Sequence, residues 1–330
     1  MQQDATTKIQ CSQCAQQLRI PYDRGDLKVT CPNCNTSGIW RENNQSNSSE
    51  LFRKIITSKV KKIRGYTPKV GVFGVTGVGK SSLCNALFGQ DVAPVSDVAA
   101  CTREPKEIFI NSGGAGIKLV DVPGVGETIE RDKEYFELYK KLAPELDLIL
   151  WVIKADDRAY TAAEKAYTEI LRPNLKNCPV IFVINQVDKL NPLKDWDDLK
   201  NQPGSEKQKN IDMKVKEISK TFNVSAEYVE TVSVAEKYNL VNLMDAIVEI
   251  LPNEKKYPFM REANEEVKSD SAKEKAEKGI WDFIKEFAGE AWDSVKAETV
   301  KVLTETASGL AKKLWENMWK KEGKSFKFFN

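Results

Sequence analysis

The stretch GVFGVTGVGKSSLCNALFG, residues 71–89, decides the fold of this sequence. It begins with the composition of a buried strand, ends with that of a helix, and contains the pattern G-x-x-x-x-G-K-[ST] between them. Glycines let the backbone N–H groups of such a loop turn toward one point, and the start of the following helix favours an anion there. The sequence therefore predicts a phosphate-binding loop over residues 74–81.

Each residue type in this loop suits one part of a nucleotide triphosphate. We expect the ammonium of Lys80 to reach the β and γ phosphates and to act in catalysis, and the hydroxyl of Ser81 to bind Mg²⁺. The other expected nucleotide contacts are Gly74, Thr76, Gly77, Val78, Gly79 and Ser82.

The composition excludes several classes of protein. The 330 residues suffice for one large domain with one or two small ones, and 50 basic residues nearly balance 48 acidic ones, so no overall field indicates a nucleic acid or a membrane. No histidine is present, which rules out histidine-based catalytic triads and histidine metal ligands. Without an apolar run of membrane-spanning length or signal-peptide features at the start, we expect a cytoplasmic protein with reduced thiols.

Apolar runs alternate with longer helical patterns from residue 68 to about residue 251. The expected strands are KVGVFGV, KEIFINS, IKLVDV, LDLILWVIKA, PVIFVIN and YVETVSVA. This alternation predicts an α/β fold with a mostly parallel six-stranded sheet and flanking helices.

Two later segments suit the metal and the base of a guanine nucleotide. Asp121, at the end of IKLVDV, suits the Mg²⁺ side, and the N–H of Gly124 suits the γ-phosphate. In the run from Asn185 through Gln186 to Asp188, the Asp188 carboxylate can accept from both N1–H and N2–H of guanine, a pair that adenine does not offer.

A third segment is expected at the end of the last strand. Backbone N–H groups of Ser233 and Val234 are placed there to meet the guanine carbonyl. The order of all these segments, each at a strand end, predicts one nucleotide site at the carboxyl edge of the sheet.

The motifs GVTGVGKS, DVPG and NQVD are similar to the G1, G3 and G4 motifs of translation-factor-class GTPases, on the Era-like and MnmE-like branch. The stretches SSLCNALFG, PVSDVAACTRE and ERDKEYFELYKKLAPELDLILWVIKADDRA resemble more closely the bacterial YfjP/YkfA type of the 50S ribosome-binding GTPase family. The resemblance covers residues 50–255, and we place the GTPase domain at residues 66–255. It implies binding of GTP or GDP with Mg²⁺, slow hydrolysis and a switch that reports the γ-phosphate. It also implies that Thr102 is the switch I threonine, which closes over Mg²⁺ and the γ-phosphate.

Departures from the family pattern leave the rate of hydrolysis open. Val125 stands where related enzymes carry a glutamine that orients water, so hydrolysis is expected to be slow without a partner or dimerisation. Gln186 replaces a lysine that covers the base, and Gly77 replaces the asparagine of potassium-stimulated relatives. The alternative function is a GTP-gated interaction module or membrane-associated scaffold with little intrinsic hydrolysis.

Two Cys-x-x-Cys pairs near the start predict a second site. Their thiolates complete a tetrahedral metal site with no open position, so we expect a structural Zn²⁺ bound by Cys11, Cys14, Cys31 and Cys34. We place this zinc ribbon at residues 1–41 and expect a β-hairpin between the knuckles with Arg24-Gly25 at its turn. An iron–sulfur cluster and a metal-free tail are the alternatives. RNA, the ribosome or a protein are the partners that such a ribbon suits.

The two flanking regions each leave two alternatives open. Residues 42–65 combine a linker with a basic helix that suits either an anionic lipid or RNA surface, or packing on the GTPase domain. Residues 256–330 carry an amphipathic helical stripe with a basic, aromatic end. This helical C-terminal region is expected either to dock on the domain or on a second copy in a homodimer, or to make peripheral membrane contact.

Overall fold

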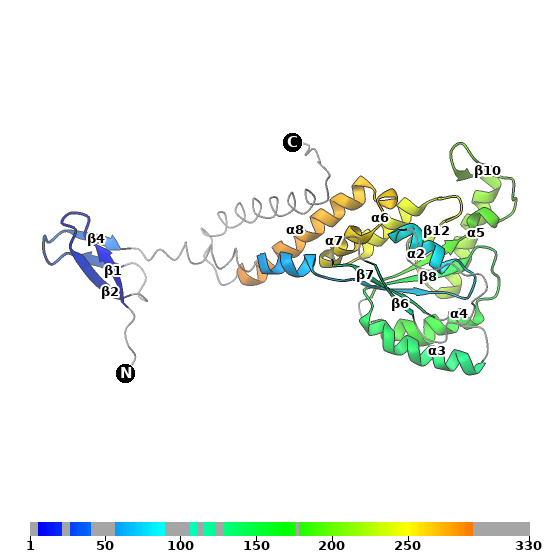
Figure 1. Ribbon diagram of the computed structural model, residues 1–330, viewed down its shortest axis with the longest axis horizontal. Helices are drawn as coiled ribbons and strands as arrows, with labels where there is room; N and C mark the ends of the chain where they lie inside the picture. Colours follow the sequence, from blue (N-terminus) through cyan, green and yellow to red (C-terminus); the bar gives the residue numbers. More distant parts are fainter. Residues whose placement is uncertain are drawn as a thin grey trace. The chain divides into compact units, whose positions relative to one another are not determined.

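A computed structural model of the chain describes residues 6–21, 27–40, 57–89, 106–110, 115–122, 129–175 and 178–292 (Figure 1). Among these, residues 6–21 and 27–40 belong to one compact unit and residues 58–291 form a second. The predicted linker and the tail beyond residue 292 lie outside the described residues.

Six strands form the central sheet of the larger unit in the order β12–β9–β8–β5–β7–β6. Their bounds are β5 Lys69–Phe73, β6 Lys106–Ile110, β7 Ile117–Asp121, β8 Leu148–Lys154, β9 Val180–Asn185 and β12 Val229–Thr231. All neighbouring strands are parallel except β6, which runs antiparallel to β7. The predicted α/β fold with a mostly parallel six-stranded sheet is confirmed.

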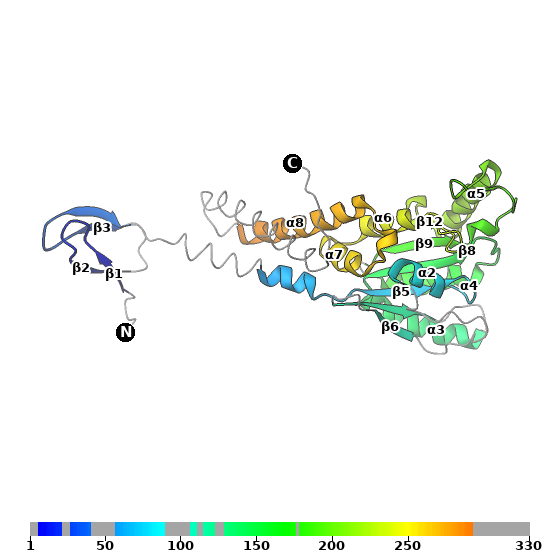
Figure 2. The ribbon, with the colours of Figure 1, turned by 45° about the horizontal axis from the view of Figure 1, so that its top comes forward.

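Helices cover both faces of this sheet (Figures 1 and 2). The helices are α2 Lys80–Phe88, α3 Ile129–Leu142, α4 Thr161–Lys165, α5 Ser205–Phe222, α6 Leu240–Ile250, α7 Asn253–Glu262 and α8 Asp270–Trp292. The shorter elements are η1 Ala143–Glu145, the π-helical η2 Ala166–Leu171, η3 Arg172–Asn174, η4 Val187–Lys189, η5 Ala226–Tyr228, η6 Glu265–Val267, and a small hairpin of β10 Trp196–Asp197 with β11 Gln202–Pro203.

The strands are apolar on both sides because both faces are buried, as in other parallel sheets. In β8, LILWVIK, six of the seven residues are buried and only Lys154 is partly exposed. Alternate residues enter two separate cores, since successive side chains of a strand point to opposite faces. Leu148 and Leu150 join the first core, and Ile149 and Trp151 join the second.

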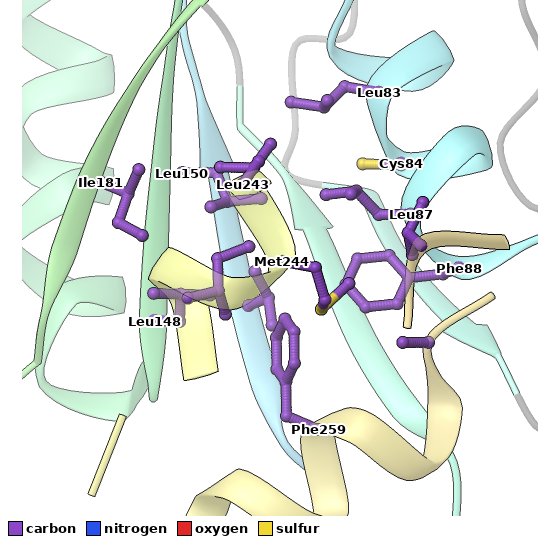
Figure 3. Packing of buried hydrophobic residues seen from close by; sticks show 14 of the residues in the cluster. Leu83, Cys84, Leu87, Phe88, Leu148, Leu150, Ile181, Leu243, Met244 and Phe259 are labelled. Carbon is purple, nitrogen blue, oxygen red and sulfur yellow. The ribbon is translucent and has the colours of Figure 1, made fainter. Parts of the chain in front are cut away.

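The first core lies between the sheet and helices α2, α6 and α7 (Figure 3). Leu83 and Leu87 of α2 and Leu243 of α6 have no exposed surface. Phe259 of α7 meets Phe88 of α2 edge to face, with ring centroids 5.4 Å apart. Ala272 and Ala276 of α8 belong to the same core, so the first part of α8 packs on the larger unit. For the described part of the C-terminal region, this packing corresponds to the predicted alternative in which the region docks on the GTPase domain.

The second core lies on the opposite face and is rich in aromatic rings. Trp151 stacks on Phe73 with centroids 5.7 Å apart, and Phe182 packs against Phe222 of α5 at 4.9 Å. Aromatic pairs contribute about 0.5–1.5 kcal/mol each beyond the area they bury. This core fixes the ends of β5, β8 and β9, from which the loops of the candidate site begin.

The predicted basic helix is described over residues 57–64. Val60 and Ile63 are buried, while Lys61, Lys62 and Arg64 are exposed. This described part therefore packs through its apolar face and leaves its basic face in solvent. Among the described residues, no helix is long and apolar enough to cross a membrane.

The smaller unit consists of two separate two-stranded hairpins. Strand β1 Thr6–Gln10 pairs with β2 Gln17–Pro21, and β3 Leu27–Thr30 pairs with β4 Ser37–Trp40. The expectation of a hairpin between the two knuckles is therefore wrong, because β2 pairs with β1 and β3 pairs with β4. Each Cys-x-x-Cys segment is itself the turn of a hairpin. The residues 24 and 25, expected at a turn, lie outside the described residues.

Asp147, just before β8, is a buried carboxylate that joins distant parts of the larger unit. It is 5% exposed. It accepts hydrogen bonds from the Tyr66 hydroxyl at 2.8 and 2.9 Å, the Lys69 N–H at 2.8 Å and the Lys255 ammonium at 2.5 Å. Burial first, and then the hydrogen bond to Asp147, raise the pKa of Tyr66. Helix α7 is thereby fixed to the start of two central strands.

We expect Asp147→Ala to lower the free energy of unfolding by about 2–4 kcal/mol, because it leaves three donors without their buried acceptor. Urea unfolding followed by circular dichroism measures this loss. The matched control is Glu107→Gln, which removes a half-exposed carboxylate 3.1 Å from the Lys69 ammonium. The control should change stability by less than about 1 kcal/mol. Equal, small effects of both variants would contradict a structural role for Asp147.

Candidate nucleotide-binding site

The loop between β5 and α2 has the backbone conformation that its glycines permit. Gly74, Gly77 and Gly79 have φ angles of 140°, 87° and 90°, which side chains disfavour. A Cβ on Gly74 would lie 2.3 Å from the Val152 carbonyl oxygen, and one on Gly79 would lie 2.5 Å from Nδ2 of Asn185. Both positions therefore require glycine for space as well as for backbone angle.

Helix α2 begins at Lys80 with its first turn open to an anion. Its N-cap is Gly79, no side chain caps it, and its first turn has no acidic residue. The ammonium of Lys80 donates to the carbonyls of Gly74 at 3.0 Å and Val75 at 3.3 Å, so the side chain folds back over the loop. Uncapped N–H groups at a helix start and an adjacent ammonium are what a phosphate group needs. This arrangement fits the phosphates of a nucleotide.

The remaining loop residues divide into exposed and buried positions. Thr76 and Gly77 are exposed at the tip, whereas Val78 is 2% exposed and belongs to the first core. Ser81 and Ser82, in the first turn of α2, are half-buried. The buried Val78 side chain anchors the loop, while its carbonyl stays available to a neighbouring segment.

Asn185, the last residue of β9, connects the loop after β9 to the loop between β5 and α2. It is 1% exposed. Its Nδ2 donates to the Val78 carbonyl at 2.9 Å, and its Oδ1 accepts from the Gln186 N–H at 2.8 Å. Gln186 has a left-handed backbone, with φ 64°, and its Nε2 donates to the Gly77 carbonyl at 3.3 Å. Two consecutive side chains thus connect the two loops directly.

Asp188 lies in η4 and is held by Ser233. Its carboxylate accepts from the Ser233 hydroxyl at 2.5 Å, and the same hydroxyl oxygen accepts from the Glu236 N–H at 3.2 Å. Ser233 is fully buried, and its own N–H donates to the Tyr238 carbonyl at 3.2 Å. Ser233 therefore contacts the Asp188 carboxylate through its side chain, while its N–H is engaged within its own loop. Val234, the next residue, packs partly against the first core.

Lys207 of α5 is a residue at this site that the sequence reasoning missed. Its side chain is fully buried, and its ammonium donates to the Asp188 carbonyl at 2.5 Å. Burial lowers the pKa of Lys207, against the opposing effect of nearby carboxylates. A signal was present in the sequence: the buried face of α5 has a helical spacing that places lysine at two otherwise apolar positions. These buried positions are Lys207, Ile211, Lys214, Ile218 and Phe222.

The metal side of the site is described only in part. Asp121 ends β7, where the register pairs it with Val72, two residues before Gly74. The backbone thus brings Asp121 to the strand edge from which the phosphate loop leaves. Thr102, Gly124 and Val125 lie outside the described residues, and their roles stay predictions.

The four cysteine side chains of the smaller unit cluster together. Their Sγ atoms all lie within 4.8 Å of one another, with Cys11 3.6 Å from Cys34 and Cys14 3.6 Å from Cys31. A tetrahedral zinc with Zn–S bonds of about 2.3 Å requires sulfur atoms about 3.8 Å apart. The donor set and its spacing therefore fit Zn²⁺.

The two knuckles share one backbone geometry. The N–H of each first cysteine bonds to the carbonyl five residues later at 2.9 Å, and the residue after each second cysteine donates back to the first cysteine's carbonyl at 2.9 Å. Ala15 and Asn35 occupy that position with φ angles of 60° and 54°. Both knuckles are thus folded to present their thiols to a shared centre.

Comparison with known proteins shows the family to which the chain belongs. Residues 69–186 match the family described as 50S ribosome-binding GTPase. Together with the fold and the loop after β5, this match defines a P-loop GTPase.

The chain belongs to the branch of that family that includes YkfA and YfjP of Escherichia coli K12. It is 35% identical to the uncharacterized protein YkfA over 270 residues, which cover 79% of this chain and 91% of YkfA. It is 38% identical to the uncharacterized protein YfjP over 221 residues, covering 67% and 75%. The tRNA modification GTPase MnmE of Streptococcus pyogenes is 36% identical over 154 residues, covering 46% of this chain and 32% of MnmE. The predicted family resemblance is confirmed.

We expect Gly79→Ala to destabilise the nucleotide-free protein more than Gly77→Ala. Both substitutions place a side chain at positive φ, which costs about 1–2 kcal/mol. Only the Cβ at position 79 also displaces the Asn185 amide, because nothing lies within 4 Å of a Cβ at position 77. Loss of that buried hydrogen bond adds about 1–3 kcal/mol. Urea midpoints of the two variants provide the comparison, and equal midpoints would contradict the bridging role of Asn185.

Proposed function

We propose that the chain binds GTP with Mg²⁺ and hydrolyses it to GDP and phosphate, and that it works as a nucleotide-dependent switch. The observation that carries the proposal is the connection between the two loops. The Asn185 amide joins a loop with phosphate-binding geometry to the loop that carries Asp188. Family membership supports guanine nucleotide as the ligand.

Each step is assigned to residues of this chain. Lys80 and the backbone N–H groups of the loop bind the β and γ phosphates and stabilise the charge that develops on them. Ser81 and Asp121, with Thr102, hold the metal site, and a bound Mg²⁺ neutralises phosphate charge. The Gly124 N–H contacts the γ-phosphate. Asp188 selects guanine, and water attacks the γ-phosphate in line with the departing GDP.

The rate of hydrolysis separates this proposal from its alternative. Because Val125 cannot orient water, we propose that hydrolysis is slow until a partner or a second copy of the chain contributes. A single-turnover rate that rises with protein concentration supports activation by a homodimer. A rate that stays near zero at every concentration supports a GTP-gated interaction module or membrane-associated scaffold.

We expect Asp188→Asn to weaken GDP binding by about a hundredfold, because the amide cannot accept from both guanine N–H groups in charge-assisted bonds. The same variant should gain affinity for xanthosine diphosphate, whose C2 carbonyl accepts from the new amide. Calorimetric titration in Mg²⁺ measures both. Lys80→Ala, in a parallel assay of phosphate release, should abolish hydrolysis. Unchanged preference for guanine in Asp188→Asn would overturn the proposed base recognition.

We also propose that Cys11, Cys14, Cys31 and Cys34 hold one structural Zn²⁺. A unit of two short hairpins has too small a core to fold alone, so a metal bound by four thiolates supplies folding energy. Because a reducing compartment keeps these thiols available and supplies GTP, we propose that the protein is cytoplasmic.

Zinc content tests this site. We expect about one Zn²⁺ per chain by elemental analysis, and its loss in Cys31→Ser. The matched control is Cys178→Ser, which removes a thiol from the larger unit, where burial raises the pKa of Cys178 to about 12. The control should keep its zinc. Zinc retained by Cys31→Ser would contradict the four-thiolate site, and iron in place of zinc would support a cluster.

We propose a partner for the smaller unit from its exposed charges. In the described part of the smaller unit, Lys8 and Arg19 are paired across β1 and β2 and exposed, and Lys28 is exposed on β3. The described residues of this unit include no acidic side chain. These charges support RNA, including that of the ribosome, as the ligand of the zinc ribbon. Peripheral membrane contact is the alternative role that we propose for the C-terminal helices.

A further inference from the structure

We propose that Lys207 is a positioning residue for guanine selection: its ammonium holds the backbone of Asp188 so that the carboxylate stays aimed at the base. The inference rests on the proposed function, since it concerns the same pocket. The inference adds to this pocket a residue from α5, a helix that contains no nucleotide-binding motif.

The surroundings of Lys207 are unusual for a lysine. The side chain has no exposed surface, and its ammonium lies 2.5 Å from the Asp188 carbonyl, 3.5 Å from the Leu193 carbonyl and 5.4 Å from the centre of the Trp196 ring. Within the described parts of the chain, no carboxylate forms an ion pair with it. Burial of an ammonium without a paired carboxylate costs desolvation energy. The carbonyls and the aromatic face offset this cost only while they stay in place, so we infer that Lys207 fixes the position of those carbonyls.

Lys207 is itself held in place by Asp195. The Asp195 carboxylate accepts from the N–H groups of Glu206 at 2.9 Å and of Lys207 at 2.8 Å, at the start of α5. An ideal Cβ on Gly204 would lie 1.8 Å from the same carboxylate, so only glycine allows this approach. The Cα of Lys207 is therefore fixed before its side chain reaches Asp188.

The same assembly also contacts the loop of Ser233. Trp196 meets the Tyr238 ring edge to face at 5.3 Å, and Tyr238 pairs with Ser233 through two backbone hydrogen bonds of 2.8 and 3.2 Å. Asp188 is thus fixed at both ends, with Lys207 on its carbonyl and Ser233 on its carboxylate. A carboxylate held at two points recognises two N–H groups of a base without ordering itself on binding.

Lys214 provides a matched control on the same helix. It is 7% exposed, its ammonium donates to the Asp157 carbonyl at 2.5 Å, and it lies 4.9 Å from the centre of the Tyr160 ring. Like Lys207 it bonds to a backbone carbonyl beside an aromatic ring, and it differs in an additional ion pair with Glu217 at 3.2 Å. Its carbonyl partner belongs to the segment after β8 and not to the loop that carries Asp188. Loss of Lys214 should therefore cost stability without changing base selection.

The test compares GDP with inosine diphosphate, which lacks the 2-amino group and so loses one of the two bonds to Asp188. Dissociation constants for both ligands in Mg²⁺ are measured for the full-length wild type, Lys207→Met and Lys214→Met. We expect the ratio of the inosine to the guanine constant to fall about threefold to tenfold in Lys207→Met. Lys214→Met should keep the wild-type ratio within about twofold. A simple loss of stability would weaken both ligands equally and leave the ratio unchanged.

Lys207→Gln, which retains a polar side chain, replaces Lys207→Met if the latter does not fold, and its ratio should fall as well. An unchanged ratio in a folded Lys207 variant overturns this inference while leaving the proposed function intact. An equal fall in Lys214→Met also overturns it, because the effect would not be specific to the base loop. Absence of GDP binding by the wild type would overturn the proposed function itself.

Discussion

The buried amide of Asn185 is the interaction on which the candidate site depends. One side-chain amide donates to the loop after β5 at Val78 and accepts from the loop after β9 at Gln186. Gly79 must lack a side chain for this amide to fit, and β5 and β9 must end at the same edge of the sheet to bring the two loops together. The parallel sheet and the glycine pattern thus allow one contact that joins the two loops of the candidate site directly.

Among the described residues, three buried charged groups lie where segments distant in the sequence meet, and each has at least one backbone partner. Asp147 joins α7 to β5, and Lys207 joins α5 to the loop after β9. Glu262, which is fully buried, accepts from the Gly116 N–H at 3.0 Å and from its neighbour Arg261, whose guanidinium reaches the carbonyl of Tyr66 at 3.1 Å. Removing one partner of such a group is costly because the other stays buried. These groups therefore define the joints of the fold.

Local pattern predicted the sheet and the loop after β5 because each depends on residues close in sequence: an apolar run and a glycine spacing. The pairing of β1 with β2 and β3 with β4 was missed because the segment between the two Cys-x-x-Cys pairs was assigned to one hairpin, whereas each pair connects the strands of its own hairpin. Lys207 was missed because the acceptor of its ammonium is the backbone carbonyl of Asp188, nineteen residues away. Side-chain contacts to a distant backbone leave no mark in local composition, whereas a lysine on an apolar helical face does and can be sought.

The central claim is that the loop after β5 and the loop after β9 form one pocket that binds a guanine nucleotide through both ends. Titration calorimetry of the full-length protein with GDP and with ADP, each in Mg²⁺, tests it most directly. The account predicts saturable binding of GDP at one site per chain and no measurable heat with ADP, which shares the phosphates but not the base. Equal binding of the two nucleotides, or no binding of GDP, would contradict it.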